Sequence, residues 1–125
     1  MKIAVSAAGK GLDAQTEQRF GRCGYFVIVD SDTMKEESVE NGSSMASGGA
    51  GTSAGQMIAE KGVEVVLTGN CGPNAFGVLN AAGIKVVTGV SGTVRDAVER
   101  YKKGEFKEND SANVADHHGS GGRRR

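Results

Sequence analysis

The sequence predicts an α/β domain with a mixed five-stranded sheet, and three observations lead to this prediction. From about residue 52 onward, short β-branched runs alternate with helical segments, which is typical of a parallel sheet covered by helices. Nearer the amino terminus, two strand-like runs are separated only by the turn-forming residues 31–34, which predicts an antiparallel hairpin. A chain of 125 residues is long enough for one domain with one real core.

Five strands are expected. Tyr25–Asp30 is the clearest by propensity, and Glu36–Glu40 is so charged that it is expected at an edge of the sheet. The run of valines and leucine at 63–67 has the most buried character. The predicted strands are residues 2–6, 25–30, 36–40, 63–67 and 84–88.

Three helices are expected between and after the later strands. Gly62 and Gly83 are typical residues just beyond a helix end, and Pro73 fits a first helical position because its missing N–H is not needed there. Thr93 and Asp96 have the spacing of a capping box. The predicted helices span residues 52–61, 73–82 and 94–103.

These elements combine into one topology. With right-handed crossovers, the strand order is 3-2-1-4-5, counted along the chain, and the second strand is antiparallel to the rest. The domain is expected over residues 1–104, followed by a polar, disordered tail at 105–125. The glycine- and serine-rich stretch 41–55 is expected to be mobile, either a linker or a lid.

Composition excludes several classes of partner. Lys and Arg balance Asp and Glu at 15 each, but Arg123, Arg124 and Arg125 supply three of the positive charges, so residues 1–122 carry 12 against 15, a net of −3. A net negative charge over residues 1–122 disfavours binding to the negatively charged backbone of a nucleic acid. No run is long enough to span a membrane and no signal peptide is seen, so a cytoplasmic protein with reduced cysteines is expected.

The predicted topology brings the two cysteines to one edge of the sheet. Cys23 lies just before the second strand and Cys71 just after the fourth, and these positions share an edge because the two strands run in opposite directions. Gly69, Asn70 and Gly72 form the turn around Cys71, and helix N-termini at this edge favour an anion. Two thiolates beside such a turn point to an iron–sulfur cluster or another soft metal.

Other interpretations of these residues remain open. For each cysteine, a structural role as a small buried or packing residue explains the sequence about as well as a role as a metal ligand does. Arg22 would lower the pKa of Cys23 if it were close, and would help to hold an anion. Two cysteines do not complete a tetrahedral site, so a cluster here would either be under-ligated, and hence transferable, or be completed by His117 and His118 or by a second chain.

Alternative functions are a phosphate or nucleotide binder and a thiol-redox protein. The glycine turns lack the Lys-Ser/Thr ending of a phosphate-binding loop. The cysteines lack the Cys-x-x-Cys spacing of many redox proteins. A nuclease is rejected, because the first strand carries no carboxylate for two-metal chemistry.

Several stretches resemble the dinitrogenase iron–molybdenum cofactor biosynthesis family. They are residues 1–6 (Met-Lys-Ile-Ala-Val-Ser), 19–26 (Arg-Phe-Gly-Arg-Cys-Gly-Tyr-Phe), 72–76 (Gly-Pro-Asn-Ala-Phe), 82–86 (Ala-Gly-Ile-Lys-Val) and 91–94 (Ser-Gly-Thr-Val), with Tyr101 and Gly104. The resemblance covers about residues 1–105 and is carried mainly by the Phe-Gly-Arg and Gly-Thr-Val pieces together.

The resemblance implies a ribonuclease-H-like fold and a non-enzymatic carrier of an iron–sulfur or molybdenum-containing cluster. Its implied partners are cluster donor and acceptor proteins, with the chain itself a monomer or a weak homodimer. Relatives often carry histidine in the stretch that corresponds to 41–55, whereas this chain has none there. Ligation is therefore expected mainly from Cys23 and Cys71.

Overall fold

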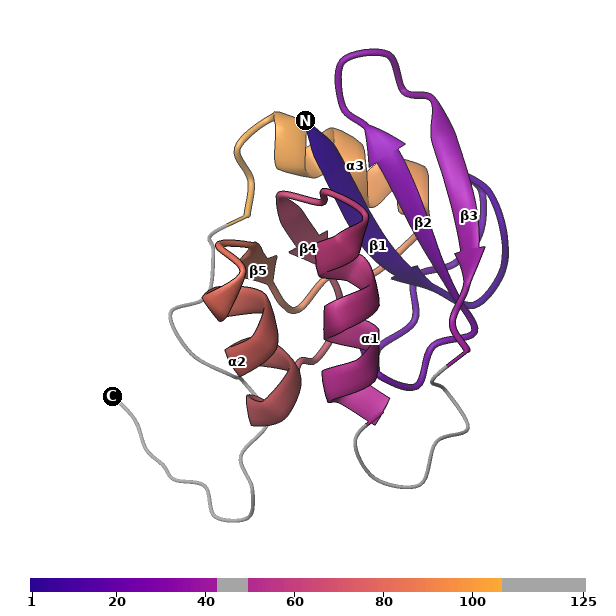
Figure 1. Cartoon of the computed structure of the whole chain (residues 1–125). Helices are drawn as coiled ribbons and strands as arrows, with labels where there is room; N and C mark the ends of the chain where they lie inside the picture. The colour runs from indigo at the N-terminus through magenta and orange to yellow at the C-terminus, as the bar shows by residue number, and fades with distance from the viewer. Residues whose placement is uncertain (43–49, 107–125) are drawn as a thin grey trace.

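A five-stranded mixed sheet forms the middle layer of the computed structural model, which describes residues 1–42 and 50–106 (Figure 1). The strand order is β3-β2-β1-β4-β5, as predicted. β2 is antiparallel to β1 and β3, while β1, β4 and β5 are parallel. The strands are β1 (Lys2–Ala7), β2 (Tyr25–Asp30), β3 (Glu36–Glu40), β4 (Val65–Leu67) and β5 (Lys85–Val87).

Three helices cover the two faces of this sheet. Figure 1 shows α1 (Ala50–Glu60) and α2 (Pro73–Ala81) on one face and α3 (Val94–Lys102) on the other. Successive strand residues point to opposite faces, so Ala4 packs in the cluster that contains α1 and α2, and Ile3 and Val5 pack in the cluster that contains α3. The sheet is therefore buried on both sides, which explains why its central strands are almost wholly apolar.

The predicted loop 41–55 overlaps the predicted helix 52–61, and the structure confirms the helix and extends it to residues 50–60, so the prediction of a mobile loop is wrong for residues 50–55. α1 begins at Ala50, and two of its glycines allow close contact with α2. A Cβ added to Gly51 would lie 3.2 Å from the Cβ of Ala75, and one added to Gly55 would lie 3.1 Å from Cγ1 of Val78. The glycines serve helix packing rather than flexibility. The rest of the predicted loop, residues 43–49, lies outside the described part of the chain.

α3 begins where its sequence predicts and ends at Lys102, one residue before the predicted end. The Thr93 hydroxyl accepts a hydrogen bond from the backbone N–H of Asp96 at 3.1 Å. Gly104, with φ of 78°, follows the helix end, and a glycine is favoured where φ is positive. Beyond it, Arg100 pairs with Glu105 at 3.2 Å and stacks on Phe106, so these two residues of the predicted tail pack on the domain. Residues 107–125 lie outside the described part.

Other boundaries differ from the predictions by one or two residues at most. β4 is shorter than the predicted 63–67, although Val63 is buried directly ahead of it. β5 is likewise shorter than 84–88, and α2 ends at Ala81 instead of residue 82. Within residues 1–42 and 50–106, no helix has the length and apolar character needed to cross a membrane.

Candidate functional site

The candidate site lies at the carboxyl edge of the sheet, which we define by the last residues of β1, β4 and β5 (Ala7, Leu67 and Val87) and the first residue of β2 (Tyr25). The amino ends of α1 and α2 lie at this same end of the molecule (Figure 1). Ligand sites of open α/β sheets favour such an edge, because loops and helix N-termini meet there.

A segment at residues 16–24, here called the strap, crosses the carboxyl edge. Its Gln18 carbonyl accepts a hydrogen bond from the backbone N–H of Asn70 at 2.6 Å, and its Phe20 N–H donates to the Asn70 carbonyl at 3.2 Å. The Gln18 side-chain amide also donates to the Val90 carbonyl at 3.2 Å. The strap is therefore fixed to the turns that follow both β4 and β5.

A chain of two buried hydroxyls fixes the strap to the sheet itself. The Ser6 hydroxyl donates to the Glu17 carbonyl at 2.7 Å. Because its single proton is used in this way, the Thr68 hydroxyl must donate to Ser6, with 2.7 Å between the two oxygens. Ser6 and Thr68 have no exposed surface, and this arrangement satisfies both hydroxyls inside the core.

Cys23 lies in the strap and is completely buried. Its thiol is 3.3 Å from the Phe20 carbonyl, to which it donates. Burial raises the pKa of this thiol to about 12, and hydrogen bonds from the Ala7 backbone and the Asn41 side chain only partly oppose that effect. The pKa of Cys23 is thus raised, not lowered as it would be beside a close Arg22, because loss of hydration outweighs the favourable interactions of the thiolate.

Cys71 follows β4 and is 1% exposed. Burial raises the pKa of its thiol to about 11. Cys23 and Cys71 belong to the same hydrophobic cluster, together with Phe20, Phe26 and Ala75, and no disulfide joins them. Both cysteines thus pack in the core on the face of the sheet that α1 and α2 cover, and at neutral pH both are held as protonated thiols.

The turn around Cys71 is occupied by contacts within the protein. Gly69 is buried against Gln18: a Cβ added there would lie 2.6 Å from the Gln18 Cα, so only glycine fits under the strap. The backbone N–H and carbonyl of Asn70 both bond to the strap. Gly72 is the residue before α2, and its carbonyl accepts from the Phe76 N–H at 3.0 Å. Gly69 and Asn70 therefore position the strap.

Two helix N-termini meet beside this turn. α2 starts at Pro73 without a side-chain cap and with no acidic residue in its first turn, and α1 also has no acidic residue in its first turn. A Cβ added to Gly51 of α1 would lie only 3.2 Å from the Cβ of Ala75 in α2, so the two first turns are adjacent. Helix N-termini carry partial positive charge, and two adjacent ones without acidic neighbours favour an anionic ligand.

The predicted histidine ligands cannot be placed at this edge. His117 and His118 lie outside the described residues. Within residues 1–42 and 50–106, no three His, Cys, Asp or Glu side chains come together in a group that could hold a metal ion. Among described residues, the soft donors at the carboxyl edge are the two cysteines.

The profile of one protein family matches almost all of the described chain. The family is described as "Dinitrogenase iron-molybdenum cofactor", and the match covers residues 1–104. The chain belongs to this family. The resemblance seen in the sequence is thereby confirmed, and the end of the match coincides with the residue after which the tail was predicted.

Solved structures similar to this family member share its fold. The orange protein of Desulfovibrio gigas, determined in its apo form, is 47% identical, with a TM-score of 0.88 over 90% of this chain and 96% of that one. An NMR structure from Thermotoga, described as a candidate NifB protein, is 37% identical, with a TM-score of 0.75 over 86% and 91% of the two chains. A relative found by its sequence, the uncharacterized protein MJ0580 of Methanocaldococcus jannaschii, is 28% identical, and the match covers 86% of this chain and 90% of that protein.

Sequence reasoning missed one residue of the site in this family member. Asn41 is 3% exposed, and its side-chain amide donates to the carbonyls of Gly21 at 3.2 Å and Cys23 at 2.9 Å. Its position directly before Gly42 in a polar stretch predicts a turn, not a buried contact. The only sequence signal was its place immediately after the predicted strand Glu36–Glu40.

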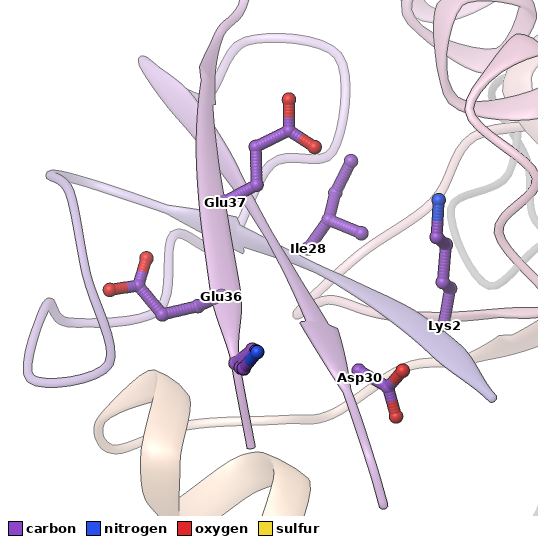
Figure 2. Close-up of a pocket in the computed structure, with 6 residues that line it drawn as sticks. Lys2, Ile28, Asp30, Glu36 and Glu37 are labelled. Atoms are coloured by element: carbon purple, nitrogen blue, oxygen red, sulfur yellow. The ribbon is translucent and has the colours of Figure 1, made fainter. Parts of the chain in front are cut away.

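A pocket of about 160 Å³ lies at the opposite end of the sheet. Figure 2 shows Lys2, Ile28 and Asp30 on β1 and β2, beside Glu36 and Glu37 of β3, whose side chains point to different sides of that strand. Lys35 completes the lining. This pocket contains hard, mixed charges and no sulfur, so it does not suit a thiophilic ligand.

Proposed function

We propose that this protein binds and carries an iron–sulfur or molybdenum-containing cluster during cluster assembly or transfer, without catalysing a reaction. Membership of the iron–molybdenum cofactor family over residues 1–104 supports the metal context. The observation that carries the proposal is the position of Cys23 and Cys71: they come from separate parts of the chain, lie just before β2 and just after β4 at the carboxyl edge, and pack in the core on the same face of the sheet.

The chemistry of this edge agrees with such a cargo. Thiolates bind iron–sulfur and molybdenum–sulfur species because both partners are soft. Sulfide-rich clusters are anionic, and the adjacent N-termini of α1 and α2 favour negative charge. The cargo contacts proposed here are Cys23 and Cys71, with Gly69, Asn70 and Gly72 shaping the turn and Arg22 adding positive charge.

The buried state of the thiols determines how the cargo would be bound and released. Metal ligation by cysteine requires the thiolate, so binding must remove a proton from each thiol that is used. Both thiols are also shielded from solvent by the protein itself. A ligand of this kind is taken up only when the edge opens, which suits temporary transport rather than permanent storage.

The raised pKa values argue against the thiol-redox alternative. Thiol–disulfide exchange starts from a thiolate, and reactive cysteines have lowered pKa values in exposed, electropositive places. Here burial raises the pKa to about 12 for Cys23 and about 11 for Cys71. In the carrier proposal, the transfer partners are proteins that donate and accept the cluster, and no nucleic acid or membrane takes part.

Anaerobic reconstitution tests this proposal. The protein is incubated with iron, sulfide and molybdate, separated from free metal, and examined by visible absorption and metal analysis. Cys23→Ala and Cys71→Ala are each expected to weaken binding at least about tenfold, because even outer-shell substitutions cost about 10–100-fold in metal affinity. Absence of a chromophore in the wild type, or full binding by the double variant, would refute the cysteine-based carrier.

A matched control separates ligation from packing. Met57 is a half-buried sulfur residue that packs against the same cluster as the cysteines. Met57→Leu removes a sulfur atom but keeps a similar side-chain volume. Because Met57 is not a proposed ligand, this variant should bind the cluster as well as the wild type does. Urea unfolding of all variants shows whether a loss of binding reflects a loss of fold.

A further inference from the structure

Asn41 holds the part of the strap that contains Cys23. The side-chain amide donates to the carbonyls of Gly21 and Cys23, and the backbone N–H donates to the Gly24 carbonyl at 2.9 Å. The amide nitrogen is also 3.8 Å from the Cys23 sulfur. One buried residue at the end of β3 thus bonds to three carbonyls within four consecutive residues.

Glycines flank the segment that Asn41 holds. Gly21 and Gly24 enclose Arg22 and Cys23, and we call residues 21–24 the flap. Neither glycine has a positive φ, so the closed flap is unstrained, while both retain the wide backbone freedom of glycine for an open state. Cys23 is buried, and Arg22 beside it is exposed to solvent.

The residues on the amino side of the flap are held much more firmly. Phe20 is 2% exposed, and its ring packs against Phe26 with 5.1 Å between centroids. Glu17 and Gln18 are bonded to the sheet and to Asn70, and Asn41 takes no part in those hydrogen bonds. An opening that breaks the bonds to Asn41 would therefore stop at Phe20.

We propose that Asn41 is a latch on this flap, and that release of its side-chain hydrogen bonds exposes Cys23 while Cys71 stays covered. This inference rests on the proposed function, since it concerns how a cluster would reach its first ligand. Cys71 follows Asn70, whose backbone bonds to Gln18 and Phe20 lie outside the flap. Opening the flap leaves those bonds in place, so Cys23 becomes accessible first.

Alkylation of the cargo-free protein by iodoacetamide tests the latch. Cys23 is followed in a Cys71→Ala background and Cys71 in a Cys23→Ala background. Each rate is divided by the rate of the same thiol in urea-unfolded protein, which gives the equilibrium constant for local opening. Global unfolding constants come from urea titration of each variant.

Asn41→Ala is expected to raise the opening constant of Cys23 about tenfold or more, because two hydrogen bonds are lost. The opening constant of Cys71 should change no more than the global unfolding constant. Asn80→Ala is the matched control, since Asn80 is exposed on α2, and it should change neither thiol. Equal acceleration of both thiols, or an unchanged Cys23, would overturn the latch.

A second variant tests the flap in the opposite direction, even if Asn41→Ala does not fold. A Cβ added to Gly24 would lie 3.9 Å from the Ala8 carbonyl, an ordinary contact, so Gly24→Ala fits the closed flap. Its reduced backbone freedom should slow the alkylation of Cys23. An unchanged or faster alkylation rate of Cys23 in a folded Gly24→Ala protein would show that the flap does not open by bending at Gly24. None of these measurements involves metal, so their failure would leave the reconstitution result intact.

Discussion

At the scale of single residues, the two thiols are held in the form that binds metal least well. Burial raises both pKa values above the ordinary value of 9.0. Between pH 9 and about 11, the unfolded chain loses thiol protons that the folded chain keeps. Stability therefore falls as pH rises through this window, by up to about 1.4 kcal/mol per pH unit for each thiol.

Urea unfolding at pH 8.0, 9.0, 10.0 and 10.5 measures this effect. Lysines and tyrosines also titrate in that range, so the informative quantity is the difference between the wild type and the Cys23→Ala/Cys71→Ala variant. The free energy of unfolding of the wild type should decline more steeply than that of the variant. Parallel curves would mean that the thiols are exposed in the folded protein.

The same residue scale shows where sequence reasoning reached its limit. Strand order placed Cys23 and Cys71 at one edge, because that position depends only on strand direction. Their burial depends on the strap, which is fixed by Asn41 and Asn70, residues distant from it in sequence. Hydrogen bonds of this kind leave no periodic pattern in the sequence. Sequence reasoning therefore identified the edge of the sheet but did not predict that the strap buries the cysteines there. The roles of the cysteines as ligands remain a prediction.

At the scale of elements, α1 and α2 show that glycine has two different uses in one pair of helices. Gly55 lies at the contact, where an added Cβ would approach Val78 at 3.1 Å, whereas one added to Gly77 would meet open space. The sequence analysis placed Gly77 inside a predicted helix but counted Gly55 with the glycine-rich loop 41–55, because composition does not show that Gly55 packs against α2. This is why the amino end of α1 was mistaken for loop.

The two glycines should respond oppositely to alanine. Gly77→Ala is expected to stabilise the protein by about 0.5–1 kcal/mol through helix propensity alone. Gly55→Ala has the same propensity gain but must displace α2, so it should stabilise less or destabilise, and Gly55→Val should cost about 1–3 kcal/mol. Urea midpoints of the three variants measure these effects. A larger gain at Gly55 than at Gly77 would show that the helices do not touch there.

At the scale of the whole molecule, the hydrophobic clusters of the described residues extend to Phe106, and the polar residues 107–125 are predicted from the sequence to be a disordered tail. A shortened chain that ends at Phe106 should therefore keep its thermal midpoint within about 2 °C, because surface and terminal changes usually cost less than about 0.5 kcal/mol. Circular dichroism melting of the full and shortened chains measures this.

The shortened chain also removes His117 and His118. If the cysteines are the main ligands, reconstitution with iron, sulfide and molybdate should give the same chromophore in both chains. Loss of the chromophore with an unchanged thermal midpoint would instead assign a ligand to the removed segment.

Topology was the most predictable property of the molecule. The alternation of apolar runs and helix signals fixes which elements exist, and the handedness of crossovers then leaves few arrangements. Element ends were less predictable, because they depend on pairing across the sheet: β4 pairs with β1 and β5 only over Val65–Leu67, although its apolar run begins at Val63.

The central position of β1 has a consequence for folding during synthesis. Its antiparallel partner β2 and the next strand, β3, follow within the first forty residues, but its parallel partner is Val65–Leu67. The ribosome needs on the order of 1–5 s to make residues 41–67 at about 5–20 residues per second. For that time a three-stranded meander has an open edge at β1, and the apolar face that α3 later covers is still bare. A nascent chain of this design is therefore most vulnerable to aggregation before β4 appears, and chaperones would act in that interval.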